Sequence, residues 1–157
     1  MNLTQHFTLE EFEASSTASS YGIDNTAPRD VIIPLYFLAE LLEDIREEIG
    51  KPILVTSGYR CPELNSVVGG SITSQHMFGE AADIKVKGMS AKDLFETIVY
   101  MPSFQRGDID QCILEFNSWV HISTIRGDIN REEFLVAKKD VLGNVIYEEY
   151  NDVWHRG

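Results

Sequence analysis

The feature that most constrains the fold is the spacing between His76 and Asp83 in the segment from Ser57 to Ile84. Seven positions separate the imidazole from the carboxylate, and Gly79 and two alanines lie between them. Side chains that meet on adjacent helical turns are about three or four positions apart, so this spacing does not suit a pair on neighbouring turns. It favours a loop that carries His76 and leads into a strand that carries Asp83.

A second imidazole, His121, lies in the apolar run 119–123. Two histidines and one carboxylate are a suitable ligand set for a zinc ion that keeps a fourth position for water. We therefore predict one zinc ion held by His76, Asp83 and His121, with His121 reaching the site from a neighbouring strand. Taken alone, each residue has a simpler explanation, because a single histidine in an apolar strand usually packs in the core and a single aspartate usually caps a turn.

Hydrophobic periodicity places most helices early in the chain and most strands late. Thr8 and Glu11 match a capping box, and Leu38 to Ile49 repeat apolar residues at helical spacing, with Gly50 as a stop. Helices are expected at 9–14, 34–49, 62–67 and 90–100, with one helical turn at 29–33. Strands are expected at 52–56, 81–86, 111–116, 119–123, 133–138 and 144–148.

The connecting segments complete the fold prediction. Residues 15–27 are rich in Ser, Thr, Ala and Asn and predict a loop, while Asn117-Ser118 predicts a tight turn. The expected class is α+β, an antiparallel sheet with helices packed on it, in a single domain of residues 1–157 that ends in a hairpin within 126–157. The C-terminal aromatic residues are expected to pack in the core or to cover one side of a groove: Phe134, Tyr147, Tyr150 and Trp154.

Composition limits the partners. The formal net charge of −12 argues against nucleic acid or an anionic membrane, because phosphate binding needs a basic face. The N-terminal residues lack the basic and apolar regions of a signal peptide, and no apolar run approaches the roughly 18 residues that span a bilayer. We expect a monomer made in the cytoplasm. Cys61 and Cys112 are expected as free thiols, with a single bridge between them as the alternative.

Three stretches together resemble the zinc peptidases of bacterial cell walls. They are Ser57-Gly58-Tyr59-Arg60, the block Ser74-x-His76-x-x-Gly79-x-Ala81-x-Asp83 and the end Glu115…Trp119-x-His121. These peptidases are the D-Ala-D-Ala carboxypeptidases and dipeptidases and the phage L-alanyl-D-glutamate endopeptidases, which share a fold with the Hedgehog signalling domain. The resemblance covers residues 30–125, and the segment from Phe7 to Phe12 is similar to the opening of small phage and prophage members.

The resemblance implies roles for individual residues. The residues that match the family's zinc ligands are His76, Asp83 and His121. Arg60 matches an arginine that binds a substrate carboxylate or steadies the developing oxyanion, a task that suits a planar, permanently charged guanidinium. A structural salt bridge is the alternative for Arg60. Ser74 and Gln75 lie beside the metal in this family, and we expect them to bind substrate or hydrogen-bond to the ligands.

The catalytic base is where the sequence departs from the family pattern. Many members place Asp or Glu three residues before the last histidine, and that position here is Ser118. The nearest carboxylate is Glu115, which a turn at 117–118 would bring toward the metal, and we predict that Glu115 is the base. A solvent-facing carboxylate at a strand end is the alternative for Glu115, and Asp110 is a more distant candidate for the base.

The leading hypothesis is zinc-dependent hydrolysis of peptide bonds in the peptidoglycan stem peptide by an endolysin-like endopeptidase of phage or prophage type. The small domain, the missing signal peptide and the lack of an added wall-binding module favour it, and such a protein would act on the cell wall after release. A D-Ala-D-Ala carboxypeptidase or dipeptidase is the alternative among enzymes. Because Ser118 occupies the usual base position, the alternative that is not an enzyme is a non-catalytic zinc-containing module that binds the wall or a virion.

Overall fold

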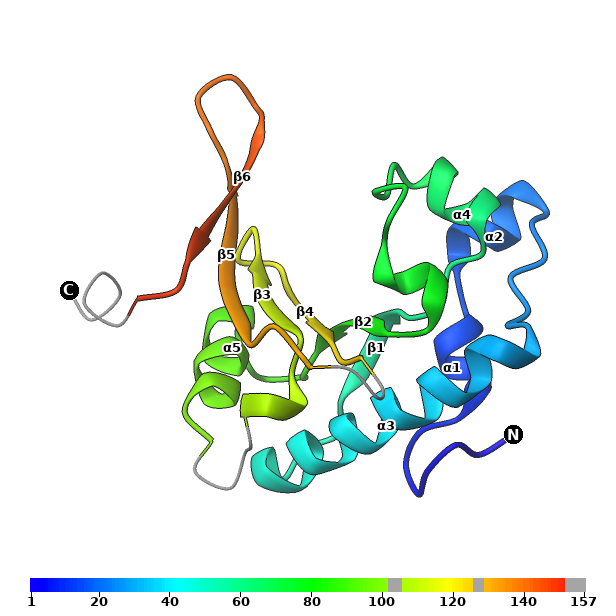
Figure 1. The fold of residues 1–157 in the computed structure, drawn as a ribbon, viewed down its shortest axis with the longest axis horizontal. Helices are drawn as coiled ribbons and strands as arrows, with labels where there is room; N and C mark the ends of the chain where they lie inside the picture. The colour runs from blue at the N-terminus through cyan, green and yellow to red at the C-terminus, as the bar shows by residue number, and fades with distance from the viewer. Residues whose placement is uncertain (102–105, 126–128, 152–157) are drawn as a thin grey trace.

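A six-stranded sheet forms the centre of the computed structural model, which describes residues 1–101, 106–125 and 129–151 (Figure 1). The strand order is β1-β2-β4-β3-β5-β6. The strands are β1 (Leu54–Ser57), β2 (Ala81–Lys85), β3 (Gln111–Glu115), β4 (Trp119–Ser123), β5 (Glu133–Lys139) and β6 (Val145–Glu149). The predicted strands are therefore present, with ends that differ by one or two residues.

The pairing of β3 with β5 departs from the expected antiparallel sheet, since these two strands run parallel. All other neighbouring strands pair antiparallel. The reason is the order of the strands: β4 folds back on one edge of β3, and β5 then takes the other edge in the direction of β3. Parallel neighbours need such a longer connection, whereas antiparallel neighbours can share a short turn. The predicted α+β class is confirmed, with a mostly antiparallel sheet.

The helices agree with the predictions for most of the chain. They are α1 (Leu9–Glu13), α2 (Ser16–Tyr21), α3 (Arg29–Ile49), α4 (Pro62–Val67) and α5 (Ala91–Val99), with 3-10 turns η1 (Gln75–Phe78) and η2 (Arg106–Asp108). The capping box of Thr8 and Glu11 forms at the start of α1. Ser90 caps α5, as expected, by accepting a hydrogen bond from the backbone of Asp93.

Helix α2 lies in the segment that composition predicts as a loop, so that prediction is wrong for residues 16–21. The side chain of Ser15 accepts a hydrogen bond from the backbone N–H of Ala18, and Gly22 ends the helix in the left-handed region at φ 65°. Ala18 is buried. Caps at both ends and one buried contact therefore stabilise a short helix that its serine-rich composition does not favour.

The helical turn expected at 29–33 is confirmed, and it is continuous with the helix expected from residue 34, because α3 begins at Arg29 and continues through Pro34. Proline beyond the first turn removes a helical hydrogen bond, which usually kinks or ends a helix. Here Val31, Leu35 and Leu38 are buried on one face, and their burial offsets the missing bond.

The two faces of the sheet have different roles. Cys112, Leu114, Val120 and Ile122 alternate onto the face that packs in the core with residues of α3 and α5, and Figure 1 shows both helices on that side. The intervening residues, among them His121, lie on the opposite face. Because side chains alternate along a strand, one face supplies the core and leaves the other face available for polar side chains.

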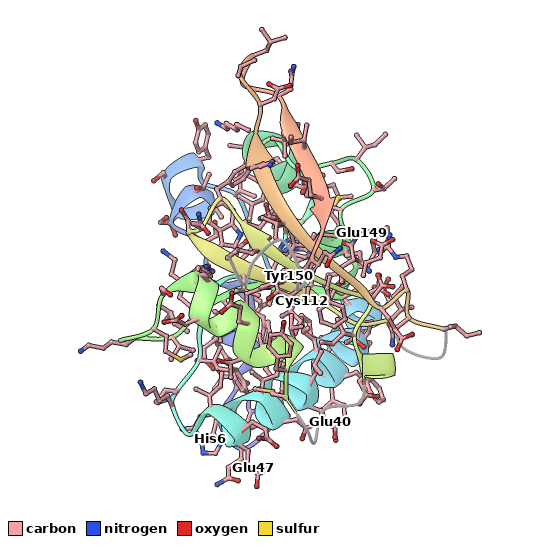
Figure 2. The ribbon with its side chains drawn as sticks, turned by 90° about the vertical axis from the view of Figure 1, so that its left-hand side faces the viewer. His6, Glu40, Glu47, Cys112, Glu149 and Tyr150 are labelled. Carbon is pink, nitrogen blue, oxygen red and sulfur yellow. The ribbon has the colours of Figure 1, made fainter. Side chains whose placement is uncertain are left out.

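The C-terminal aromatic residues lie on both faces of the sheet, some in the core and one beside the cleft. Phe134 is buried in the core, and Tyr150 packs edge-on against Phe95 with ring centroids 5.1 Å apart. Tyr150 packs against the core cluster that contains Cys112, and both residues are labelled in Figure 2. Tyr147 lies instead on the polar side of the sheet, and Trp154 falls outside the described residues.

The remaining expectations about the fold concern the cysteines, the N-terminal segment and membrane spans. Cys61 and Cys112 are both free, as predicted.

His6 helps to hold the N-terminal segment against α3, since its ring Nδ1 lies 2.8 Å from a carboxylate oxygen of Glu43 on that helix. Figure 2 shows His6 beside α3. Within the described residues, no helix is both long and apolar enough to cross a membrane.

Gly58 is a position where the fold tolerates no side chain. A Cβ atom there would lie 2.6 Å from the carbonyl oxygen and 2.7 Å from the Cα atom of Phe12. We expect Gly58→Ala to lower the free energy of unfolding by about 1–3 kcal/mol, because backbone must move to accept the methyl group. Chemical denaturation monitored by circular dichroism measures this change.

Gly107→Ala is the matched control for this substitution. The nearest atom to a Cβ at Gly107 is a carboxylate oxygen of Glu132 at 3.9 Å, which is an ordinary contact. We expect its effect to stay within about 0.5 kcal/mol. Equal stability of the two variants would contradict the close packing of Gly58 on α1.

Candidate metal centre

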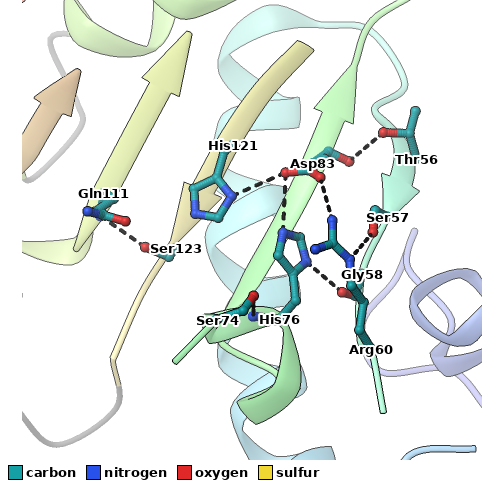
Figure 3. A network of polar contacts seen from close by, with 10 residues as sticks. All are labelled: Thr56, Ser57, Gly58, Arg60, Ser74, His76, Asp83, Gln111, His121 and Ser123. Atoms are coloured by element: carbon teal, nitrogen blue, oxygen red, sulfur yellow. Dashed lines mark hydrogen bonds and ion pairs between the residues drawn. The ribbon is translucent and has the colours of Figure 1, made fainter. Parts of the chain in front are cut away.

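His76, Asp83 and His121 come together from three different elements (Figure 3). Asp83 on β2 lies directly opposite His121 on β4 in the antiparallel ladder. His76 lies in η1, which leads into β2 through Gly79 at φ 72°. A Cβ atom on Gly79 would also lie 2.8 Å from the carbonyl oxygen of Val31, so glycine is needed there for both conformation and space.

The distances within this group suit a zinc ion. Asp83 Oδ1 lies 3.4 Å from His76 Nε2 and 3.2 Å from His121 Nδ1, and one ligand atom from each residue falls within 4.8 Å of the others. Two donors that each lie about 2.0–2.1 Å from a tetrahedral zinc ion are about 3.4 Å apart. The two separations from Asp83 and the donor types of all three side chains are therefore those that zinc requires.

Backbone contacts fix the orientation of His76. Its Nδ1 lies 2.7 Å from the carbonyl oxygen of Gly58, and a carbonyl can only accept, so Nδ1 carries the proton. The lone pair of His76 is then on Nε2, the atom that faces Asp83. The His76 carbonyl accepts from the backbone N–H of Arg60 at 3.1 Å, and Ser74 Oγ accepts from the His76 N–H at 3.3 Å. Such outer contacts set the tautomer and direction of metal-binding histidines.

Arg60 contacts the second oxygen of Asp83. Its Nη2 lies 3.3 Å from Asp83 Oδ2, and its Nε donates to Ser57 Oγ at 3.0 Å. Burial alone would raise the pKa of Asp83, but its contacts with His121 and His76 hold that pKa well below its ordinary value. Asp83 is therefore ionised, which is the form that binds a metal.

The three candidate ligands open into a cleft with a volume of about 530 Å³, a size that accommodates a small ligand or a short peptide. One side of the cleft comes from residues 70–75, which include Ser74 and Gln75. The other side comes from the polar face of the sheet, where Ile113, Glu115 and Tyr147 line it. Arg60 also lines the cleft, so it faces both Asp83 and the space for a substrate.

Glu115 reaches this cleft, whereas Ser118 is exposed outside it. Glu115 is the last residue of β3 and lies opposite Trp119. Burial raises the pKa of Glu115, and the charge of Asp83 acts in the same direction, while His121 and Arg60 oppose the shift. Ser118 Oγ donates instead to the carbonyl of Phe116. The geometry thus brings Glu115, and not Ser118, near the candidate ligands.

The turn between β3 and β4 is centred one residue earlier than expected. The Ser118 N–H donates to the Glu115 carbonyl at 2.8 Å, and the two central residues, Phe116 and Asn117, have φ of 53° and 54°. Positive φ at both centres is the pattern of a type I′ turn, which suits the twist of a hairpin. A phenylalanine in the left-handed region is unusual, so sequence alone favours the less demanding turn at Asn117-Ser118.

Asp110 and Gln75 take part in a separate network. Asp110 is fully buried and accepts a hydrogen bond from Gln75 Nε2 at 2.9 Å and from Arg131 Nη2 at 2.6 Å. This pairing occupies Asp110 and makes it unsuited to act as a base. It also ties η1 to the segment before β5. Arg131 gave no signal in the sequence, because its partner lies far away along the chain and only the folded sheet brings them together.

Residues 5–123 match the family model described as Peptidase M15. The chain belongs to the Peptidase M15 family. A segment of 44 residues is 48% identical to a zinc D-Ala-D-Ala carboxypeptidase of Streptomyces albus G. That segment covers 27% of this chain and only 17% of the relative's length. The resemblance predicted from the three motifs is confirmed at the level of the family.

The fit of the three side chains to zinc leads to a direct test. Purified wild-type protein is expected to retain about one zinc per chain after dialysis, while Asp83→Asn and His121→Ala lose it, because each removes one of three donors. Metal analysis by mass spectrometry measures the content. Zinc at 100 times its dissociation constant is also expected to stabilise the wild type by about 2.7 kcal/mol.

His6→Ala is the control for histidine loss, since His6 contacts Glu43 on α3 and not the cleft. It is expected to keep full zinc content. If Asp83→Asn binds zinc as well as the wild type does, Asp83 is not a ligand and the assignment of this group fails.

Proposed function

We propose that this protein is a zinc peptidase that hydrolyses a peptide bond within the peptidoglycan stem peptide, as an endolysin-like endopeptidase. The observation that carries the proposal is that Glu115 and Arg60 line the same cleft as the three candidate ligands. A carboxylate and a guanidinium beside such a group are the parts that metal-assisted hydrolysis requires. Membership of the Peptidase M15 family supports the same reaction class.

The residues that line the cleft have different roles in the proposed hydrolysis. A zinc ion held by His76, Asp83 and His121 supplies a Lewis acid and lowers the pKa of water when it is bound. Glu115 accepts a proton from the attacking water and donates it to the leaving amine, so that a free amine and a carboxylate result. Arg60 faces the cleft with a fixed positive charge, which suits the oxyanion that forms at the scissile carbonyl or a carboxylate of the substrate.

The extent of the cleft favours an endopeptidase. In the ladder of β3 and β4, His121 lies between the pair that contains Gln111 and the pair that contains Trp119, and both Gln111 and Trp119 line the cleft. A substrate held at the centre can therefore extend in both directions. We propose that the protein acts as a monomer, is of phage or prophage type, and reaches the cell wall after release from the cytoplasm.

A D-Ala-D-Ala carboxypeptidase is the second candidate, and the name of the Streptomyces albus G relative favours it. In that reaction Arg60 would bind the terminal carboxylate. A non-catalytic wall- or virion-binding module is the third, since Ser118 stands where many family members carry the base. The position of Glu115 in the cleft weighs against this third candidate.

The products of wall digestion distinguish the candidates. Purified peptidoglycan is treated with zinc-loaded protein, with a chelator present in the control, and the released fragments are identified by mass spectrometry. We expect chelator-sensitive fragments cut between L-Ala and D-Glu. Release of a terminal D-Ala alone would replace the endopeptidase with the carboxypeptidase, and binding to the wall without fragments would favour the module.

Glu115→Gln tests the proposed base. We expect kcat to fall by about 10²–10⁴-fold with unchanged zinc content, because the amide fills the same space but cannot accept the proton. Steady-state hydrolysis of a stem-type peptide measures the change. Glu96→Gln is the control, since Glu96 lies on α5, pairs weakly with Lys92 and does not line the cleft. Full activity of zinc-bound Glu115→Gln would show that another group takes the proton.

A further inference from the structure

A second groove adjoins the cleft at Trp119, which lines both hollows. The other residues of this groove, called the turn groove below, come from the β3–β4 turn and from β5: Phe116, Asn117, Val136, Ala137, Lys138 and Lys139. Because Trp119 lies directly opposite Glu115 in the ladder, the turn groove begins beside the proposed base. The turn groove is therefore the hollow that a peptide would meet if it extended from the cleft across Trp119.

The backbone of Phe116 is strained where it borders the turn groove. Its φ of 53° is unfavourable for a bulky side chain, whereas Asn or Gly would largely avoid that cost. The N–H of Phe116 donates to the carbonyl of Ala137 at 3.0 Å, which fixes the turn to β5. The ring packs against Trp119 with centroids 5.9 Å apart. Residues with such backbone strain cluster at active sites and ligand-binding sites.

The two lysines of the turn groove differ in their partners. Lys138 Nζ lies 2.8 Å from Glu148 Oε1, so a carboxylate of the same chain offsets its charge. Lys139 Nζ lies 5.9 Å from the centroid of the Phe116 ring. An aromatic face attracts a cation but leaves its charge in place. In a chain with net charge −12, the turn groove thus presents a cation beside two aromatic rings.

We propose that the turn groove is a specificity site for a carboxylate-bearing residue of the substrate, next to the scissile bond. The aliphatic part of that residue packs on Phe116 and Trp119, and its carboxylate pairs with Lys139. Continuity with the cleft at Trp119 identifies the occupant as an extension of the same peptide. This proposal rests on the proposed function, because it presumes that a peptide occupies the cleft, and a glutamate with a free carboxylate has the required chemistry.

The test compares two synthetic stem-type peptides that differ only in one group, a free glutamate carboxylate or the corresponding amide. Lys139→Gln is expected to lower kcat/KM for the acidic peptide about tenfold, chiefly through KM, and to leave the amide peptide unchanged. Lys139→Arg keeps the charge and is expected to retain most of the preference. An equal effect of Lys139→Gln on both peptides, or no effect on either, would overturn the proposal.

Lys92→Gln is the matched control for loss of one positive charge. Lys92 lies on α5, pairs weakly with Glu96 at 3.9 Å and lines neither hollow. It is expected to hydrolyse both peptides as the wild type does. A tenfold loss on the acidic peptide in Lys92→Gln would mean that net charge, and not the turn groove, sets the preference, which would also overturn the proposal.

Binding without turnover separates this proposal from the proposed function. Calorimetric titration of both peptides into zinc-loaded Glu115→Gln, with and without Lys139→Gln, measures the preference directly. In one outcome, the wild type cleaves neither peptide and still binds the acidic one about tenfold more tightly through Lys139. That result would refute the proposed peptidase activity and would support the turn groove as a binding site for the carboxylate. Equal affinity for the two peptides in a protein that cleaves them would instead refute only the proposal that the turn groove is a specificity site.

Phe116→Asn tests the role of the strained residue. Asparagine adopts positive φ readily, so relief of strain is expected to offset the lost ring contact and to keep the melting temperature within about 3 °C. Affinity for both peptides is expected to fall several-fold, because an apolar surface is lost. Glu132→Asn, at another residue with positive φ (57°) that lines neither hollow, is the control and should keep peptide affinity. Unchanged affinity in Phe116→Asn would show that Phe116 serves the turn only.

Discussion

The buried carboxylate of Asp83 is the group around which the rest of the site is arranged. A charge removed from water is costly unless charged or hydrogen-bonding partners surround it. Its partners are Arg60, which follows β1, His76 of η1 and His121 of β4. These partners meet only when β1, β2 and β4 pair in the observed register. A slip of one residue would turn Asp83 toward the apolar face, so the burial of this charge and the register of the sheet depend on each other.

The part of the chain beyond the family match completes the surroundings of this charge. Residues 5–123 match the family, whereas Leu135 and Tyr147, which line the cleft, belong to β5 and β6. The pair of Asp110 and Arg131 joins this later segment to η1, next to His76. The candidate ligands thus lie in the family-matched part, while much of the wall that meets the substrate comes from elements that follow it.

Local patterns in the sequence are sufficient for most elements, since caps and periodicity are short-range features, as is the spacing of His76 and Asp83. His121 lies 38 residues beyond Asp83, and the ligand set and the family resemblance join it to the other two. Three properties depend on contacts that the sequence does not display. Helix α2 needs the burial of Ala18, the parallel β5 needs a free edge on β3, and the turn at Phe116 needs its hydrogen bond to Ala137. In each case tertiary packing outweighs local preference.

The parallel pairing of β3 with β5 also affects how the molecule meets other molecules. Without β5, the strand that carries Glu115 would end the sheet and expose its backbone N–H and C=O groups, which are a template for strands of other chains. The two added strands move that boundary to β6, where every side chain is exposed and Glu148 and Glu149 place charge along the edge. The hairpin that shapes the cleft therefore also covers the edge of the strand that carries Glu115.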